Sequence, residues 1–219
     1  MSSKAKVVPY VTAYDGESVS YQLTVYPHTE ATDGMRLSYT DATAHDWMFG
    51  VLWHRHGLSR SGRPLWKLVN TSRQRRCMLH RLCQVCGRSA VKGGRTWWLL
   101  PEPPSVTGCG RRFTHVPPTC RWCIPKARAW CPRLSPESYV CTTRASEAYG
   151  VVADVYRPAA GRKLVVVQRA AEVPLEAFRQ LEYALATQLL VGLEDLQRLN
   201  LQHADESFRS IEGEPWISG

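Results

Sequence analysis

The sequence predicts an α+β fold with a β-rich body, a central cysteine-rich unit and a long C-terminal helix. Segments rich in β-branched and aromatic residues lie on both sides of two CxxC pairs, and leucines recur at spacings of three or four near the C-terminus. We divide the chain into an N-terminal β segment with a basic loop (1–71), the cysteine-rich unit (72–134), strands plus an amphipathic helix (135–203) and a flexible polar tail (204–219). We expect these parts to form one composite domain.

The expected strands are rich in β-branched and aromatic residues, and turn-forming residues separate several of them. They are residues 7–14, 20–26, 47–53, 96–100, 139–143, 150–156 and 163–169. The segment 55–64 contains three arginines and two glycines, so we expect a flexible basic loop there.

Two helices are expected. Ser72 is a favourable N-cap for a short helix that ends at Leu82 and then enters the first cysteine pair. Pro174 stands where the first residue of a helix is favoured, and a long amphipathic helix is predicted over 174–202. The apolar face of this longer helix consists of Phe178, Leu181, Leu185, Leu189, Leu193 and Leu196.

Composition sets the broad class of protein. Hydrophobic residues make up 44% and charged residues 21% of the chain, which are ordinary values for a globular protein. No apolar run approaches the roughly 18 residues needed to cross a bilayer, and residues 1–6 lack the apolar stretch of a secretory signal. We therefore expect a cytoplasmic protein without membrane contact, in which paired cysteines indicate metal rather than disulfides.

Four of the eight cysteines form two CxxC pairs, Cys83 with Cys86 and Cys120 with Cys123. Each pair supplies one edge of a tetrahedral zinc site. Gly87 permits the positive φ that follows a zinc knuckle, and the second pair is expected at a helix start, where the helix dipole favours thiolates. A knuckle, a hairpin and a helix are the parts of a treble clef. The sequence therefore predicts a treble-clef-like zinc unit that binds one structural Zn²⁺ per chain.

Other cysteine arrangements carry less weight. Four residues recur at a spacing of three: Cys77, His80, Cys83 and Cys86. On a single helix they would form a stripe that cannot surround an ion without unwinding. A second metal site drawing on Cys109 and His115 stays open. Cys131 and Cys141, like Cys109, have no cysteine partner at metal-binding spacing and are expected to be small buried residues.

The stretch 75–88 resembles the start of the zinc-containing HNH endonucleases, in which a helix enters a CxxCG knuckle. Those enzymes place a catalytic histidine soon after the knuckle, where it activates water beside a divalent metal. Residues 88–100 of this chain contain no His and no Asp, and no second His or Asn at the required spacing follows Cys123. The resemblance implies the scaffold of these enzymes without their catalysis.

A second resemblance covers residues 9–170. The chain is similar to a group of uncharacterised actinobacterial proteins, both chromosomal and phage-borne, that contain the CxxC…CxxC pattern. The matching segments are Pro9-Tyr10-Val11, Gly62-Arg63-Pro64, Arg73-Gln74-Arg75-Arg76, 82–87, Trp98-Leu99-Leu100, 117–123 and Cys131-Pro132. This resemblance implies a zinc-binding bacterial protein and no particular activity.

The net charge of +9 is concentrated in the middle of the chain, because residues 55–133 hold 17 basic side chains and only one acidic side chain, Glu102. Such an excess is typical of proteins that contact DNA or RNA. The candidate phosphate contacts are Arg63, Lys67, Arg73, Arg75, Arg76 and Arg81. Five tryptophans of the same stretch are candidates for stacking on unpaired bases: Trp66, Trp97, Trp98, Trp122 and Trp130.

Two alternatives to a nucleic-acid-binding zinc protein stay open. In the first, the protein is an interaction adaptor stabilised by zinc, and the helix over 174–202 packs on a protein partner. In the second, it is a degenerate HNH-type nuclease that uses His54 and His56, joined by Asp46 or His45. A His-x-His on a strand points both rings to one face. The basic residues near this histidine pair favour a surface loop that contacts phosphate over a catalytic site, so we expect no catalysis.

Overall fold

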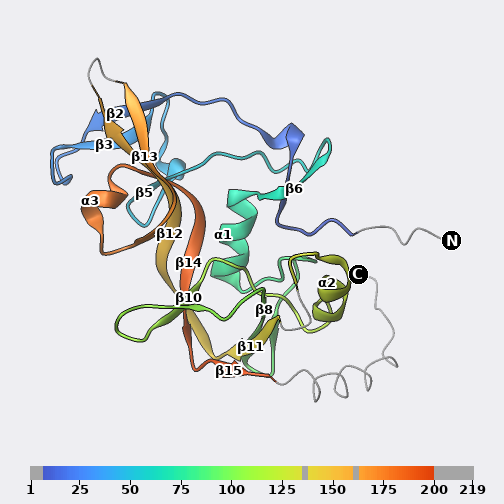
Figure 1. Ribbon diagram of the computed structural model, residues 1–219. Coiled ribbons are helices and arrows are strands. Elements are labelled where there is room, and N and C mark those ends of the chain that lie inside the picture. The colour runs from blue at the N-terminus through green and yellow to red at the C-terminus, as the bar shows by residue number, and fades with distance from the viewer. Residues whose placement is uncertain (1–6, 135–137, 160–162, 200–219) are drawn as a thin grey trace.

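The computed structural model describes residues 7–134, 138–159 and 163–199, most of them in strands and the loops that join them (Figure 1). The N-terminal half contains β1 (Thr12–Tyr14), β2 (Leu23–Pro27), β3 (Met35–Tyr39), β4 (Trp47–Met48), β5 (Val51–Trp53), β6 (Pro64–Val69), α1 (Thr71–His80), β7 (Val91–Lys92) and β8 (Arg95–Leu100). The remainder contains β9 (Ser105–Val106), β10 (Arg112–Thr114), α2 (Ile124–Trp130), β11 (Tyr139–Thr143), β12 (Ala145–Pro158), β13 (Leu164–Pro174), α3 (Phe178–Leu181), β14 (Ala184–Glu194) and β15 (Gln197–Arg198). Short 3-10 turns cover Asp15–Glu17 and Ala44–Asp46.

Strand β14 is central to the largest sheet, whose order is β13-β12-β14-β10-β9. Two strands share the edge of β14 that lies opposite β12. Strand β5 pairs in parallel with the first half of β14, and β10 pairs antiparallel with its second half. Figure 1 shows β12 and β14 running through the molecule from the end that carries β2, β3 and β13 to the end that carries β8, β11 and β15. A four-stranded sheet, β15-β11-β8-β7, and the two-stranded sheets β1-β6 and β2-β3 complete the fold.

The prediction of a β-rich body is confirmed, and each predicted strand overlaps an observed one. Several strands were not predicted: β3, β6, β7, β9, β10, β14 and β15. Strand β3 pairs with β2, and β6 follows directly on the segment interpreted as a basic loop and pairs with β1. None of the helices within the described ranges is long and apolar enough to span a membrane.

The predicted long helix over 174–202 is wrong for the described residues. Only α3 is helical there, and the leucines at 185, 189 and 193 lie on β14. A spacing of four residues is close to one helical turn, but it is also even, so in a regular strand it places side chains on one face equally well. In β14, Leu189 and Leu193 share the main core, whereas Leu185, beyond an irregularity in the pairing with β12, packs in a second cluster. The residues between these leucines are also mostly buried, as in a strand that is covered on both faces. Residues 200–202, like the predicted tail 204–219, lie outside the described residues.

Helix α1 confirms the predicted short helix, although it begins earlier than expected. Asn70, rather than Ser72, is the N-cap, and its side chain accepts a hydrogen bond from the backbone N–H of Arg73 at 3.1 Å. The helix ends where Arg81 adopts a left-handed conformation with φ of 52°. Its apolar side joins the main core, in which Met78 packs with residues of β14 and β8 such as Leu189 and Trp98.

A buried glutamine fastens α1 to the central strand. The side chain of Gln74 is 0% exposed, donates to the carbonyl oxygens of Leu189 at 3.0 Å and His115 at 2.9 Å, and accepts from the backbone N–H of Leu189 at 2.9 Å. The two bonds to Leu189 satisfy backbone groups on the edge of β14 where β5 and β10 pair with other residues.

We expect Gln74→Leu to lower the free energy of unfolding by about 2–3 kcal/mol, because an apolar side chain of similar size leaves buried backbone groups without partners. The measurement is urea denaturation of both proteins. Gln180→Leu is the matched control, since the side chain of Gln180 bonds the exposed side chain of Gln168 and the loss of this bond should cost about 0.5 kcal/mol or less. Equal stability of the two variants would contradict the role assigned to Gln74.

Candidate metal centre

The first cysteine pair lies on a tight knuckle that follows α1. The backbone N–H of Cys83 donates to the carbonyl of Arg88 at 2.7 Å, and the N–H of Gly87 donates to the carbonyl of Cys83 at 2.8 Å. Gly87 adopts φ of 73°, as the sequence predicts, and a Cβ at this position would lie 3.0 Å from the ring of Tyr10. The knuckle therefore needs glycine both for its backbone angle and for the packing of Tyr10.

The second pair lies at the start of α2. Two backbone N–H groups, those of Cys123 and Ile124, donate to the carbonyl of Cys120, and Cys123 is the N-cap residue of the helix. The hairpin of β7 and β8 lies between the two pairs in the sequence. The knuckle also bonds to the chain just before the second pair, because the N–H of Gln84 donates to the carbonyl of Pro118 at 2.8 Å.

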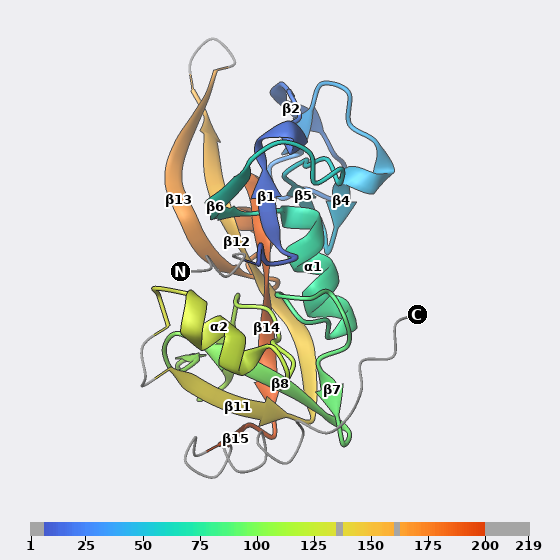
Figure 2. The same cartoon turned by 90° about the vertical axis from the view of Figure 1, so that its right-hand side faces the viewer.

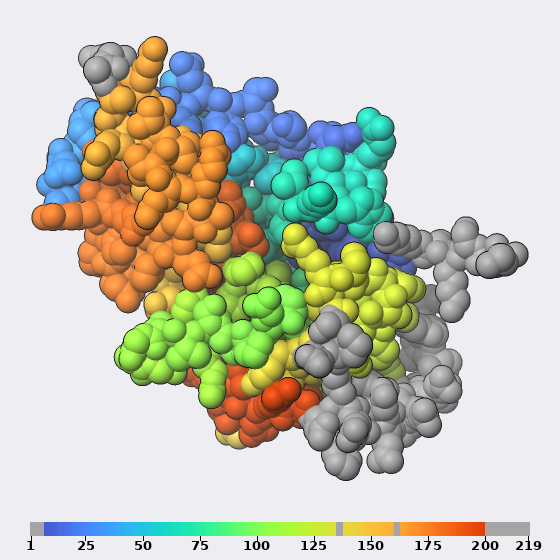
Figure 3. All heavy atoms as spheres, viewed as in Figure 1, coloured from blue at the N-terminus to red at the C-terminus, as the bar shows by residue number. Residues whose placement is uncertain are grey.

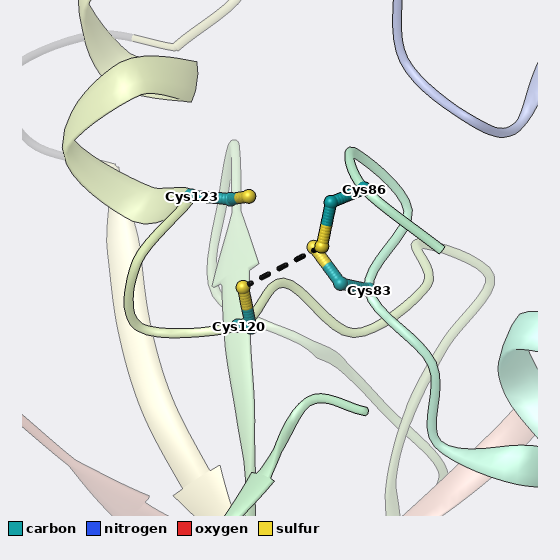
Figure 4. A group of neighbouring side chains, drawn as sticks. All are labelled: Cys83, Cys86, Cys120 and Cys123. Atoms are coloured by element: carbon teal, nitrogen blue, oxygen red, sulfur yellow. Dashed lines mark hydrogen bonds between the residues drawn. The ribbon is translucent and has the colours of Figure 1, made fainter. Parts of the chain in front are cut away.

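The four predicted ligands come together in space (Figure 4). The sulfur atoms of Cys83, Cys86, Cys120 and Cys123 all lie within 4.8 Å of one another, and the sulfurs of Cys86 and Cys120 are 3.9 Å apart. That separation is far longer than the roughly 2.05 Å of a disulfide. It agrees with the edge of a tetrahedral ZnS₄ site, about 3.8 Å for Zn–S bonds of about 2.3 Å. The cluster can therefore hold a metal ion.

Neighbouring thiols perturb one another in this cluster. Hydrogen bonds from the thiols of Cys120, Cys123 and Cys83 hold the pKa of Cys86 well below its usual range. Hydrogen bonding to Cys120, Cys83 and Cys86 raises the pKa of Cys123. Four thiolates this close would repel one another, so protons or a cation must balance their charge. A bound cation would replace those protons and bind all four sulfurs as thiolates.

Three cysteines of the cluster are buried and Cys86 is exposed. Cys77 is separate from it: the Cys77 thiol is directed at the carbonyl of Cys83 at 4.0 Å, and burial raises its pKa to about 12. The stripe interpretation that joins Cys77 and His80 to the first pair therefore receives no support. Within the part of the chain that the structure describes, no other group of three or more ligating side chains is close enough to hold a metal.

The remaining cysteine candidates are scattered. Cys109 is exposed and contacts the hydroxyl of Thr107 at 3.0 Å, so a second site with His115 is not assembled among the described residues. Cys141 is buried in the main core, as predicted, but the same prediction is wrong for Cys109, which is exposed, and Cys131 is only partly buried.

His54 and His56 lie on one side of the chain, as their spacing predicts, with ring centroids 4.6 Å apart. Burial lowers the pKa of both rings, to about 4 for His56, which also accepts a hydrogen bond from the backbone N–H of Thr71. Asp46 is not directed to this pair, because it accepts two hydrogen bonds of 2.7 Å from Arg55. Neither His45 nor any other ligating side chain completes a group of three with the two rings in the described ranges.

Arg73 requires a correction, because it is not available to phosphate. Its side chain is 3% exposed and makes two hydrogen bonds, of 2.6 and 2.7 Å, to the carboxylate of Glu17, which is fully buried. It also donates to the carbonyl of Thr12 at 2.7 Å. No local sequence pattern indicates this pair, since Glu17 and Arg73 are 56 residues apart.

The other basic candidates divide into two kinds. Arg75 is half-buried, with its guanidinium 4.5 Å from the ring centroid of Trp53, and burial lowers its pKa. The remaining candidates, Arg63, Lys67, Arg76 and Arg81, are exposed. Only Arg63 among these four lies near a carboxylate in the described chain, with its Nε 3.5 Å from Asp15.

The geometry thus assembles all four predicted metal ligands and leaves four of the six predicted basic residues at the surface. It also adds Glu17, for which no sequence pattern indicated a buried partner. No family model, curated protein or solved structure matches this chain.

The Glu17–Arg73 pair predicts acid sensitivity. Burial raises the pKa of Glu17, but hydrogen bonds from Arg73, from the N–H groups of Arg60 and Tyr14 and from Asn70 outweigh it and lower the pKa to about 2. Because the folded pKa is depressed, this carboxylate contributes stability above about pH 4.5 that is lost as the pH falls toward 2.

We expect Glu17→Gln to be about 3 kcal/mol less stable at pH 7, since it leaves the Arg73 guanidinium buried without its counter-charge. The difference from the wild type should shrink as the pH falls below about 4.5. Urea denaturation at several pH values measures this. Asp15→Asn is the control, because the exposed Asp15–Arg63 pair should contribute about 1 kcal/mol or less. A pH-independent difference would contradict the assignment.

Proposed function

We propose that this protein is a non-catalytic zinc-binding protein that contacts nucleic acid, or a nucleoprotein complex, through its basic central segment. The observation that carries the proposal is the combination of a four-cysteine cluster with an exposed basic surface around it. The likeness to the bacterial and phage-borne CxxC…CxxC group belongs to the same proposal.

The donor set favours zinc with a structural role. Cys83, Cys86, Cys120 and Cys123 would provide four sulfur ligands, which suits tetrahedral Zn²⁺ and leaves no open position for a catalytic water. The order of knuckle, β7–β8 hairpin and α2 supports the treble-clef interpretation. Bound zinc would join the end of α1 to the start of α2 and so stabilise the surface that both helices present.

The charge of that surface favours a polyanion. Lys67, Arg76, Arg81 and Arg88 are exposed, and none of them pairs with a carboxylate in the described part of the chain. Strand β6, α1 and α2 all lie on the side of the molecule turned toward the viewer in Figure 2. The exposed residues Lys67 on β6 and Arg76 on α1 can therefore contact one phosphate backbone.

A protein-interaction adaptor is the second candidate. The described residues 174–199 do not form the helix first considered for this role, but the long edge strand β13 exposes Val165 and Val167, and nearby Phe178 is 69% exposed. An exposed apolar edge strand is a surface to which another chain can add a strand.

The zinc proposal predicts about one zinc per chain by elemental analysis of the purified protein. Cys83→Ser and Cys120→Ser should lose the metal and lower the melting temperature, because structural zinc contributes folding free energy. Cys109→Ser is the matched control and should keep both the zinc and the melting temperature of the wild type, since this exposed cysteine lies outside the cluster. A zinc-free chain that melts like the zinc-loaded protein would refute the proposal.

The nucleic-acid proposal predicts binding to generic DNA or RNA at low salt that weakens steeply as salt is added. Arg76→Ala combined with Arg81→Ala should weaken binding and reduce the salt slope by about 2, without changing zinc content. Arg157→Ala combined with Arg179→Ala is the control, because these exposed arginines lie on β12 and α3. Absence of binding at low ionic strength would contradict the nucleic-acid proposal and favour the adaptor candidate.

A further inference from the structure

Two tryptophans of the basic central segment are unusually exposed. Trp66 on β6 is 51% exposed and Trp122 is 42% exposed, whereas Trp98 of the same segment is 0% exposed and belongs to the main core. Exposing so large an apolar side chain to water is unfavourable, and exposed aromatic residues on a charged surface are typical of binding sites.

Trp66 lies on a strand whose two faces are both accessible. Leu68, two residues further along β6 and so on the same face as Trp66, is 54% exposed, and Lys67 between them is also exposed. Strand β6 pairs with β1 along one edge and with no other described strand. This arrangement presents an indole and a cation side by side.

Trp122 is held by the candidate metal centre itself, because it stands between Cys120 and Cys123. The guanidinium of the preceding residue, Arg121, lies 4.5 Å from the centroid of its ring. A cation on one face of an indole fixes the orientation of the ring and adds a second planar group on which a base can stack.

A series of backbone hydrogen bonds connects the two tryptophan sites. Strand β6 pairs with β1, and the residues just before β1 bond the knuckle, with Tyr10 N–H to the Val85 carbonyl at 3.0 Å and Val11 N–H to the Gln84 carbonyl at 3.2 Å. Gln84 in turn bonds Pro118, next to the second cysteine pair. Figure 3 shows the surfaces of β6, in teal, and of α2, in yellow-green, on the same side of the molecule.

We infer that Trp66 and Trp122 stack on unpaired bases, so that the ligand is single-stranded DNA or RNA; this inference rests on the proposed function. In a duplex the base faces are covered by their neighbours, and an exposed indole gains little from them. A single strand offers both its phosphates and its base faces. The charge of this segment, with one carboxylate among residues 55–133, matches such a polyanion better than it matches an apolar protein surface.

Fluorescence anisotropy of the zinc-loaded full chain tests this with a labelled oligothymidylate, an oligouridylate and a mixed-sequence duplex of the same length, at low salt. We expect the single strands to bind at least about tenfold more tightly than the duplex and to quench tryptophan fluorescence. Trp66→Ala and Trp122→Ala should each weaken single-strand binding by about tenfold with an unchanged salt slope. Trp66→Phe should retain most of the affinity, because it keeps an aromatic ring.

Lys67→Gln is the matched comparison, because it removes a charge next to Trp66. It should weaken the binding of single strands and duplex alike and reduce the salt slope by about 1. Equal binding of single strands and duplex, or tryptophan variants that bind like the wild type, would overturn the stacking inference and leave the proposed function intact. No binding of any probe at low salt would overturn both.

Discussion

The buried ion pair between Glu17 and Arg73 is the contact on which the arrangement of the N-terminal half depends. It joins the turn after β1 to α1, while Asn70, which caps the helix, also donates to the same carboxylate at 3.1 Å. One turn of α1 therefore holds the N-terminal segment through Arg73 and the central strand through Gln74. A buried pair of this kind contributes little net stability compared with apolar packing, but loss of either partner leaves an uncompensated charge. It thereby specifies where the segment docks.

The candidate metal centre imposes a second constraint on the same helix. Helix α1 leads directly into the knuckle, and the residues before β1 bond the backbone of Val85 and Gln84. Four sulfurs within 4.8 Å form a stable arrangement only when protons or a cation balance their charge. The cysteine cluster and the Glu17 ion pair therefore belong to one continuous unit, so a cation held by the cluster would also constrain the position of β1 and β6.

Basic residues that are adjacent in the sequence have different physical roles in this fold. Arg73 is neutralised inside the protein, Arg75 stacks on Trp53, and Arg76 is exposed on the same helix. The tryptophans divide in the same way, since Trp98 fills the core and Trp122 remains at the surface. The surface available to a ligand is consequently smaller than the overall charge implies, and it is confined to residues whose charge or ring the protein does not use internally.

The sequence by itself determined the four cysteines of the candidate metal centre, the knuckle glycine and about half of the strands, because each depends on spacing or on residue types within a short window. Tertiary structure decided the state of 184–194, where leucines four residues apart suit a helix face and a strand face equally well. That segment is the strand β14 because β12, β10 and β5 pair with it, and those contacts come from distant parts of the chain. Long-range pairing also decided that Arg73 is buried, since no local pattern indicates that a carboxylate 56 residues away will neutralise it.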